Sequence, residues 1–320
     1  MVSYSPWLMV PNQHHSEDRH RTESSISSGL GWWTCFANSI CGEVEEKHIK
    51  RSFLNVSTNQ VHTLELPEDA CGKRKTICGF SLGWLILFDN RNSSLTLLNP
   101  FIGDQINNLP RLPRKGTVHK AVLSADPSCN PNGYKVLAIF GDKRELIGYE
   151  QGKQQWTMLQ DYGNHYDDVL VQTDEAFVAV SELGKLVCCD PPAFNEHVPA
   201  SFFKGKKVYL VSINGDVFML VSFSGTSYCF WHETYDDKLK RFEVYRYDEG
   251  RWCHTKNLHE FTIFLGQNHS VAVRNAPDFR PDCIYFTDDD DDEGKVENSG
   301  VFSLKDGEAE RMQWFMPRLS

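Results

Sequence analysis

Short runs of apolar residues, separated by turn-forming residues, dominate the chain from about Lys47 onward. Runs of about 4–8 such residues bounded by Gly, Asn, Asp or Pro are typical of β-strands. Long stretches with a helical period are missing, and only Val198–Phe203 suggests a helix. We therefore predict an all-β protein. The predicted strands are Trp84–Phe88, Leu95–Leu98, Val136–Phe140, Val169–Val171, Phe177–Val180, Leu186–Cys189, Val208–Val211, Val217–Val221, Val271–Val273 and Ile284–Phe286.

Tight turns lie between many of these runs. Asp89–Asn92 separates two of them, and Ile213–Asp216 contains an Asn-Gly pair. Asn and Gly tolerate the positive φ angles that two-residue hairpin turns require. Strands joined by such short turns pair antiparallel.

A weak repeat of about 50 residues runs through the chain, with an apolar strand, a polar turn that usually contains Gly, and a further strand. The turns start near positions 56, 98, 149, 189, 247 and 304. Four-stranded propeller blades occupy about 40–50 residues, and closing them into a ring leaves only short edges exposed. We predict a β-propeller of antiparallel four-stranded blades, about six in number, over residues 47–320. The irregular spacing leaves a β-sandwich open as an alternative.

The first 46 residues differ from the rest. They combine a His-rich polar stretch with a Ser-rich piece, Ser24–Ser28, and show no clear hydrophobic period. We assign residues 1–46 to an irregular N-terminal segment that precedes the propeller domain.

The charge of the chain narrows the choice of partner. The net charge is −10, and the basic runs are short, whereas nucleic-acid binding needs a clustered basic face. We expect no nucleic-acid partner, and faster encounter with basic proteins.

No run reaches the ~20 apolar residues of a membrane span, and the first ten residues lack a signal-peptide pattern. With ten cysteines spread over the chain and expected to be reduced, we predict a cytoplasmic and/or nuclear location.

Three motifs suggest catalysis or metal binding, and each has a simpler explanation. Gly79–Gly83 fits G-x-S-x-G, but a nucleophile elbow needs a strand before the Ser and a helix after it, and we predict a turn into a strand. Cys188 and Cys189 are adjacent, so their side chains face opposite sides of a strand. Asp288–Glu293 is an acidic run without alternating calcium-ligand spacing, typical of a solvated loop. We therefore predict no catalytic residue, no metal site and no cofactor.

Aromatic residues give the candidate binding positions. Trp156 and Trp252 follow matching turns, and we expect them to pack between neighbouring sheets. Interfaces favour aromatic anchors, and an aromatic loop lies between two predicted strands, with a second, weaker candidate elsewhere. The candidate protein-binding residues are Tyr228, Phe230, Trp231, His232 and Tyr235 in that loop, and His165 and Tyr166 in the second place.

The order of several short segments resembles a known family. Gly79–Leu87 followed by Leu97–Gly103 resembles the plant F-box-associated domain, the KIB-type β-propeller family, long a domain of unknown function. Further segments match in order. They are Pro6–Met9, Lys120–Ser124, Trp156, Asp167–Val169, Leu186–Asp190, Phe242–Tyr245, Phe264–Gly266 and Ile284–Asp288.

The resemblance implies a propeller that captures protein substrates for a cullin-type ubiquitin ligase. An F-box is a helical segment of about 40–50 residues, and no such pattern is recognisable ahead of Pro6. Docking on a Skp-type adaptor and a cullin is therefore in doubt, and capture without delivery is an alternative. We predict a non-catalytic protein-binding propeller whose protein partner is of unknown identity. The competing hypotheses are an enzyme on a propeller scaffold, with acid–base residues facing the channel, and a structural protein without a defined partner.

Overall fold

A computed structural model describes most of the chain, and the strands fall into six sheets. The described residues are 7–10, 49–55, 58, 60–66, 75–159, 165–172, 176–189, 192–195, 207–229, 234–266, 268–286 and 300–311. Every regular element among them is a β-strand. The first three sheets contain β1 (Trp7–Val10), β2 (Ile49–Asn55) and β3 (Gln60–Leu66); β4 (Lys75–Ser81), β5 (Trp84–Asp89), β6 (Ser94–Leu98) and β7 (Gln105–Ile106); and β8 (Val118–Leu123), β9 (Lys135–Phe140), β10 (Glu145–Glu150) and β11 (Thr157–Met158).

The other three sheets follow in chain order. They contain β12 (Tyr166–Val171), β13 (Phe177–Ser181), β14 (Leu186–Cys189) and β15 (Pro192–Asn195); β16 (Lys207–Ile213), β17 (Asp216–Cys229), β18 (Thr234–Asp248) and β19 (Arg251–Thr255); and β20 (Phe261–Leu265), β21 (Ser270–Arg274), β22 (Cys283–Phe286), β23 (Gly300–Ser303) and β24 (Glu308–Arg311).

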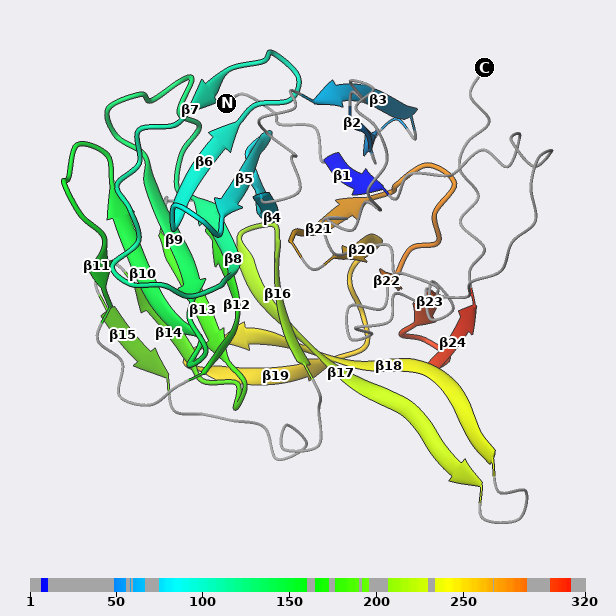
Figure 1. Ribbon diagram of the computed structural model, residues 1–320. Helices are drawn as coiled ribbons and strands as arrows, with labels where there is room; N and C mark the ends of the chain where they lie inside the picture. The colour runs from blue at the N-terminus through cyan, green and yellow to red at the C-terminus, as the bar shows by residue number, and fades with distance from the viewer. Residues whose placement is uncertain are drawn as a thin grey trace.

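The sheets are arranged around a ring (Figure 1). The strands β4, β8, β12, β16 and β21 follow one another around its centre, each in contact with the next. The backbone N–H of Phe80 in β4 donates to the carbonyl of Asn268, just before β21, over 3.4 Å. The ring of Phe80 meets that of His269 edge-on at 5.8 Å. These contacts close the circle between the second and sixth sheets, so the fold is a β-propeller and not a two-sheet sandwich.

Hydrophobic side chains fill the spaces between neighbouring sheets. The strand Trp84–Asp89 is buried at five of its six positions, because a blade has neighbouring blades against both of its faces. One such cluster joins the second and third sheets and includes Trp84, Ile86, Ala121 and Phe140. Runs of this kind show no alternation in the sequence, as expected for strands covered on both sides.

The sequence repeat matches the blade structure. Positions 98, 149, 189 and 247 lie at or near the ends of β6, β10, β14 and β18, the third strands of four consecutive sheets. Glycine follows in the next turn at Gly103, Gly152 and Gly250, with φ between 81° and 87°. This conformation is open to Gly at little cost, which explains why the repeat usually carries Gly there.

The predicted Asn-Gly hairpin is confirmed. Asn214 and Gly215 have φ of 54° and 88°, and Ile213 pairs with Asp216 across the turn. All ten predicted strands are present, most of them longer by one or two residues. The helix suggested at Val198–Phe203 lies outside the described residues.

Two parts of the fold depart from the prediction. Trp7–Val10, which we assigned to the irregular N-terminal segment, is strand β1 and pairs antiparallel with β2. The sixth sheet has the order β21-β20-β22-β23-β24 and contains a parallel pair, β20 with β22. The residues between β21 and β22 cross from the inner edge to the far side of β20, where the N–H of Asp282 donates to the carbonyl of Phe261 over 2.9 Å.

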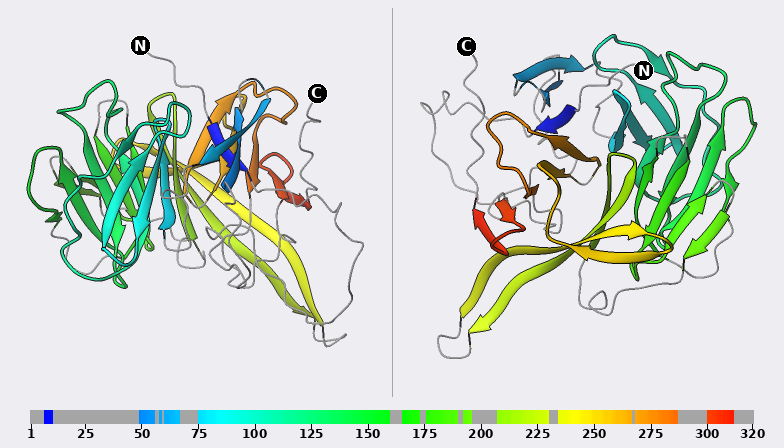
Figure 2. Two further views of the ribbon diagram at one scale, coloured as in Figure 1. Left: turned by 45° about the horizontal axis from the view of Figure 1, so that its top comes forward. Right: turned by 180° about the vertical axis from the view of Figure 1, so that it is seen from behind.

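The β17–β18 hairpin is the most extended element. Its strands have 14 and 15 residues, and they run well beyond the ring (Figures 1 and 2). The pairing shifts register between Phe223 and Gly225. Such a bulge bends the strand that carries it, and it separates the part inside the blade from the part that projects.

Candidate functional site

Charged side chains meet at the centre of the ring. Lys120 of β8 forms an ion pair with Asp168 of β12, and their side chains are 8% and 2% exposed. The Asp168 carboxylate also accepts hydrogen bonds from the backbone N–H of Val169 at 2.7 Å and of Leu210 in β16 at 2.8 Å. The Asp168 carboxylate thus connects the inner strands of three sheets. The ammonium group of Lys120 balances its negative charge, as a buried charge requires.

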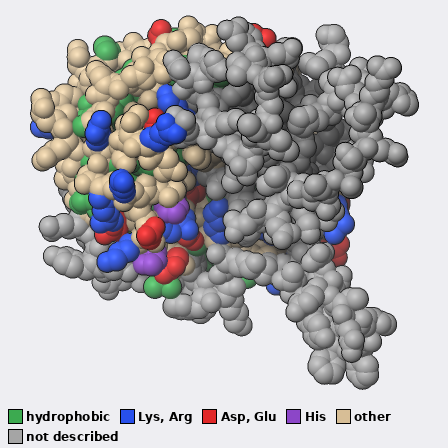
Figure 3. All heavy atoms as spheres, viewed as in Figure 1, with side chains coloured by type: hydrophobic (Ala, Val, Ile, Leu, Met, Phe, Trp, Pro, Cys, Tyr) green, Lys and Arg blue, Asp and Glu red, His purple; other side chains and the backbone are tan. Residues whose placement is uncertain are grey.

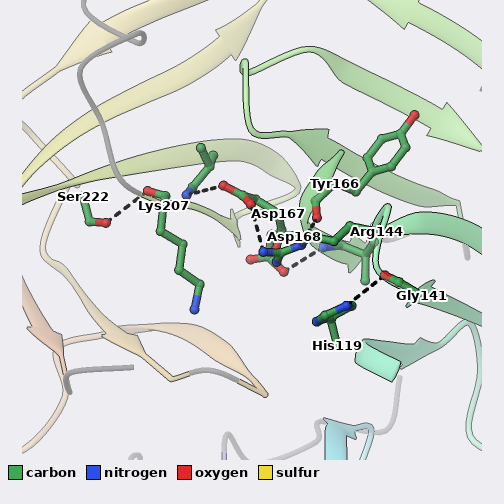
Figure 4. Close-up of polar contacts among 10 residues, drawn as sticks. His119, Gly141, Arg144, Tyr166, Asp167, Asp168, Lys207 and Ser222 are labelled. Atoms are coloured by element: carbon green, nitrogen blue, oxygen red, sulfur yellow. Dashed lines mark hydrogen bonds and ion pairs between the residues drawn. The ribbon is translucent and has the colours of Figure 1, made fainter. Parts of the chain in front are cut away.

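The neighbouring carboxylate, Asp167, makes a second connection between sheets. It accepts a hydrogen bond from the N–H of Val208 at 3.1 Å and lies 3.5 Å from the Arg144 guanidinium. Arg144 also donates to the Tyr166 carbonyl at 2.8 Å. Burial raises the pKa of Asp167, although Arg144 and the Val208 amide oppose that rise. Figure 4 shows Asp167 and Asp168 of β12 beside Arg144 of the β9–β10 turn, with Lys207 of β16 on one side and His119 of β8 on the other.

Two histidines lie in this central region. The Nε2 atom of His119 is 3.0 Å from the carbonyl oxygen of Gly141, and burial lowers the pKa of His119. Burial, together with the positive charge of Lys120, lowers the pKa of His269 to about 4. Both imidazoles are therefore neutral at pH 7.

These central residues act chiefly as connections between blades. The oxygens of Asp167 and Asp168 are engaged by backbone amides and by cations. Among the described residues, no three His, Cys, Asp or Glu side chains are grouped as a metal site would need. Sequence reasoning missed this cluster as a site. The signal that could have identified it is a pair of polar residues directly before an apolar run, His119-Lys120 before Ala121–Leu123 and Asp167-Asp168 before Val169–Val171.

The G-x-S-x-G motif is also structural. We expected a turn before Ser81, but strand β4 runs up to it, and a two-residue turn, Leu82-Gly83, leads into β5. No helix follows Ser81, as a nucleophile elbow would require. Its hydroxyl accepts from the Leu123 N–H at 3.1 Å, so Ser81 joins the second sheet to the third.

The two repeated tryptophans pack between sheets, as predicted. The indole N–H of Trp156 donates to the Pro110 carbonyl at 2.8 Å, and that of Trp252 to the Gly184 carbonyl at 3.1 Å. Each acceptor belongs to the preceding blade or to the linker that follows it. Trp156 and Trp252 also pack against the tyrosine before their own turn, with ring centroids 5.4 and 5.2 Å apart.

The adjacent cysteines face opposite sides, as predicted. Cys188 packs against the cluster between the fourth and fifth sheets, and Cys189 against the cluster between the third and fourth. Neither cysteine forms a disulfide bond, and the same holds for Cys78, Cys129, Cys253 and Cys283. The acidic run Asp288–Glu293 lies outside the described residues.

The predicted aromatic loop falls at the end of the projecting hairpin. The backbone register pairs Tyr228 with Tyr235 and Cys229 with Thr234, so the strands extend further than we expected. Phe230, Trp231 and His232 lie outside the described residues, and their role stays a prediction.

The two residues of the second candidate site, His165 and Tyr166, differ in exposure. His165 is exposed, whereas the Tyr166 side chain is fully buried, because it packs between the third and fourth sheets. Figure 4 shows its ring pointing away from the central cluster. Tyr166 is therefore a core residue and cannot anchor a partner at the surface.

The comparison with protein families agrees with this architecture. A sequence model of the KIB1-4 β-propeller family matches residues 53–303. The chain belongs to this family. The described residues of this KIB1-4 propeller contain no helix that is long and apolar enough to cross a membrane.

Relatives of this KIB1-4 propeller carry F-box names. The F-box/kelch-repeat protein At3g18720 of Arabidopsis thaliana is 23% identical over 252 residues, covering 74% of this chain and 63% of the relative. The F-box protein SKIP23 of the same plant is 24% identical over 209 residues, covering 58% and 51%. The chain thus spans only 51% to 63% of these curated relatives. Among solved structures, the Cps50 (Swd1) β-propeller domain of Myceliophteria thermophila aligns with a TM-score of 0.44 at 9% identity, over 83% of this chain and 80% of that one.

Proposed function

We propose that this KIB1-4 propeller captures a protein partner without catalysing a reaction, and that it serves as the substrate-recognition part of an SCF-type ubiquitin ligase. The F-box names of its relatives support the ligase role. The observation that carries the capture role is the β17–β18 hairpin, which leaves its blade and projects from the ring (Figure 2).

The length of this hairpin favours a contact with another molecule. A two-stranded ribbon gains little stability by itself in water, so the projecting part does not stabilise the fold appreciably. Its end, Tyr228–Tyr235, is rich in the aromatic residue types that anchor interfaces. We therefore place the partner-binding region at this end of the hairpin, with His165 as a weaker candidate.

The central cluster gives less support to an enzyme. Asp167 and Asp168 are held by amides and cations that keep the blades together, and an acid or base needs a group that can reach a substrate. We propose a cytoplasmic and/or nuclear location, which is supported by the wide spacing of the ten cysteines along the chain.

Affinity capture from plant cell extract tests both roles. The bait is the tagged chain, and a variant replaces residues 224–239 with an Asn-Gly turn so that the blade keeps its short hairpin. We expect quantitative mass spectrometry to find at least one protein enriched by the full chain and depleted tenfold or more by the variant. The control I102S/L183S removes two exposed apolar side chains elsewhere and should retain that protein.

The outcomes separate the two parts of the proposal. Recovery of a Skp-type adaptor and a cullin together with the partner supports the ligase role, and recovery of the partner alone contradicts it. Equal recovery by the hairpin variant, in a fold verified by circular dichroism, refutes the hairpin as the binding region. Absence of any enriched protein refutes capture.

A further inference from the structure

Basic side chains gather on one part of this acidic chain. Whereas the net charge is −10, the β5–β6 turn, the linker from β7 to β8 and the β9–β10 turn present more basic than acidic residues. We call this surface the cationic ridge. It consists of Arg91, Arg111, Arg114, Lys115 and Lys143, all of which are exposed. Figure 3 shows basic side chains over the side of the ring that carries these segments.

Backbone contacts hold these three segments together. The N–H of Leu112 in the linker donates to the Ser93 carbonyl in the β5–β6 turn at 2.7 Å, and the N–H of Gly141 in the β9–β10 turn donates to the Thr117 carbonyl at 2.8 Å. The cationic ridge is therefore continuous from the second sheet to the third.

The linker has a fixed conformation. Leu109 and Leu112 are buried, each 6% exposed, and the Pro110 carbonyl accepts the indole N–H of Trp156. Pro110 and Pro113 restrict the backbone further. Arg111, Arg114 and Lys115 are exposed between these anchors, so a ligand would meet basic groups whose backbone is already ordered, which lowers the entropy cost of binding.

Acidic residues on the cationic ridge are fewer and mostly engaged. Asp89 accepts the Arg91 N–H at 2.8 Å within its own turn. Glu145 pairs with Arg114, whose guanidinium also lies 5.5 Å from the Phe140 ring. Asp142 is exposed. Five basic residues thus face three acidic ones, a reversal of the sign of the whole chain.

We propose that the cationic ridge binds an acidic, extended segment of a protein partner. The inference deepens the proposed capture role and rests on it. Guanidinium groups match carboxylates in two-point contacts, and a row of them over adjoining turns suits successive acidic side chains. Nucleic acid fits less well, because carboxylates are interspersed in the ridge and the rest of the chain would repel a polyanion.

Direct binding to a defined probe tests this inference without knowledge of the partner. The probe is a fluorescein-labelled peptide of eight glutamates, measured by fluorescence anisotropy with the full chain. The variant R111Q/K115Q/K143Q neutralises three exposed positions. We expect its affinity to fall at least tenfold, and wild-type affinity to fall as salt rises from 50 to 300 mM.

A matched control separates the ridge from general charge. K153Q/R251Q/K305Q removes three exposed basic residues, from the β10–β11 turn, the start of β19 and the β23–β24 turn, and should change affinity less than twofold. The inference is overturned if the two triple variants weaken binding equally, if the ridge variant binds like wild type, or if a single-stranded oligonucleotide of equal charge binds more tightly. Peptide binding without any partner in extract would overturn the proposed function while leaving the ridge intact.

Discussion

Basic residues serve two different purposes in this propeller, one at the centre of the ring and one on the cationic ridge. Lys120 is buried and lies against Asp168, whose carboxylate also binds the backbone of two strands. Arg111, Lys115 and Lys143 are exposed. The same charge is thus part of the fold in one place and accessible to a ligand in the other.

The difference depends on solvent and on the acidic neighbour. A buried charge without its partner is very unfavourable, whereas an exposed ion pair contributes only about 0.2–1 kcal/mol. Asp168 belongs to a strand that brings it against Lys120, whereas the side chains of Arg111 and Lys115 are exposed on the linker. Changes at the centre should therefore affect folding, and changes on the ridge should affect binding.

The largest effect is expected for Asp168→Ala. It leaves Lys120 buried without its carboxylate and removes the acceptor of the Leu210 N–H. We expect a loss of about 3–5 kcal/mol in the free energy of unfolding, measured by urea denaturation. The control Asp216→Ala breaks the exposed pair with Arg246 and should cost less than about 1 kcal/mol. Similar losses for the two variants would contradict a structural role for the central pair.

The next effect is a dependence of stability on pH through His269. Its pKa is about 4 in the folded protein instead of 6.5, so folding favours the neutral ring. The stability that this contributes is complete above pH 6.5 and is lost as the pH falls from 6.5 towards 4, by up to about 3 kcal/mol. We expect urea titrations at pH 7 and pH 4.5 to differ less for His269→Gln than for wild type.

A histidine at the surface serves as the control for that measurement. His165 is exposed, so His165→Gln should keep the wild-type difference between the two pH values. An unchanged difference in His269→Gln would mean that His269 is not the group responsible.

A smaller effect is expected at a glycine near the centre. A Cβ atom on Gly79 would lie 2.1 Å from the Ala121 carbonyl oxygen, so β4 and β8 approach too closely for a side chain. Gly79→Ala should cost about 1–3 kcal/mol. Gly148→Ala is the matched control, because nothing lies within 4 Å of its Cβ position, and it should leave the unfolding free energy unchanged or slightly raised. Equal stabilities would show that the inner strands can separate.

The sequence predicted the local parts of this fold well. Apolar runs bounded by turn residues identify strands, and Asn214-Gly215 identifies a hairpin, because both signals arise from neighbours in the chain. The repeat with glycine near positions 103, 152 and 250 indicated blades for the same reason. Strand β4 was harder to predict, since Lys75 and Thr76 at its start are polar.

The central cluster could not be predicted from local patterns. Lys120 and Asp168 are 48 positions apart, and only the packing of β8 against β12 brings them together. The parallel pairing of β20 with β22 likewise depends on a chain crossing that short-range patterns do not determine. Tyr166 was predicted to contact a partner, but the register shift between Tyr166 and Asp168 places its side chain in the same core cluster as Val169, and local patterns do not determine such a shift.

The smallest effect on stability is expected where the ridge carries its own ion pair. Glu145→Gln removes the carboxylate that pairs with Arg114, whose side chain is 50% exposed, and should change the unfolding free energy by less than about 1 kcal/mol. Because Arg114 then lacks a competing carboxylate, the same variant should bind the octaglutamate peptide severalfold more tightly by anisotropy. Asp104→Asn removes an exposed acid from the β6–β7 turn and should leave affinity within twofold. Weaker binding by Glu145→Gln would mean that Glu145 orients Arg114 for the ligand and does not compete with it, which would reverse the expected role of the ion pair on the ridge.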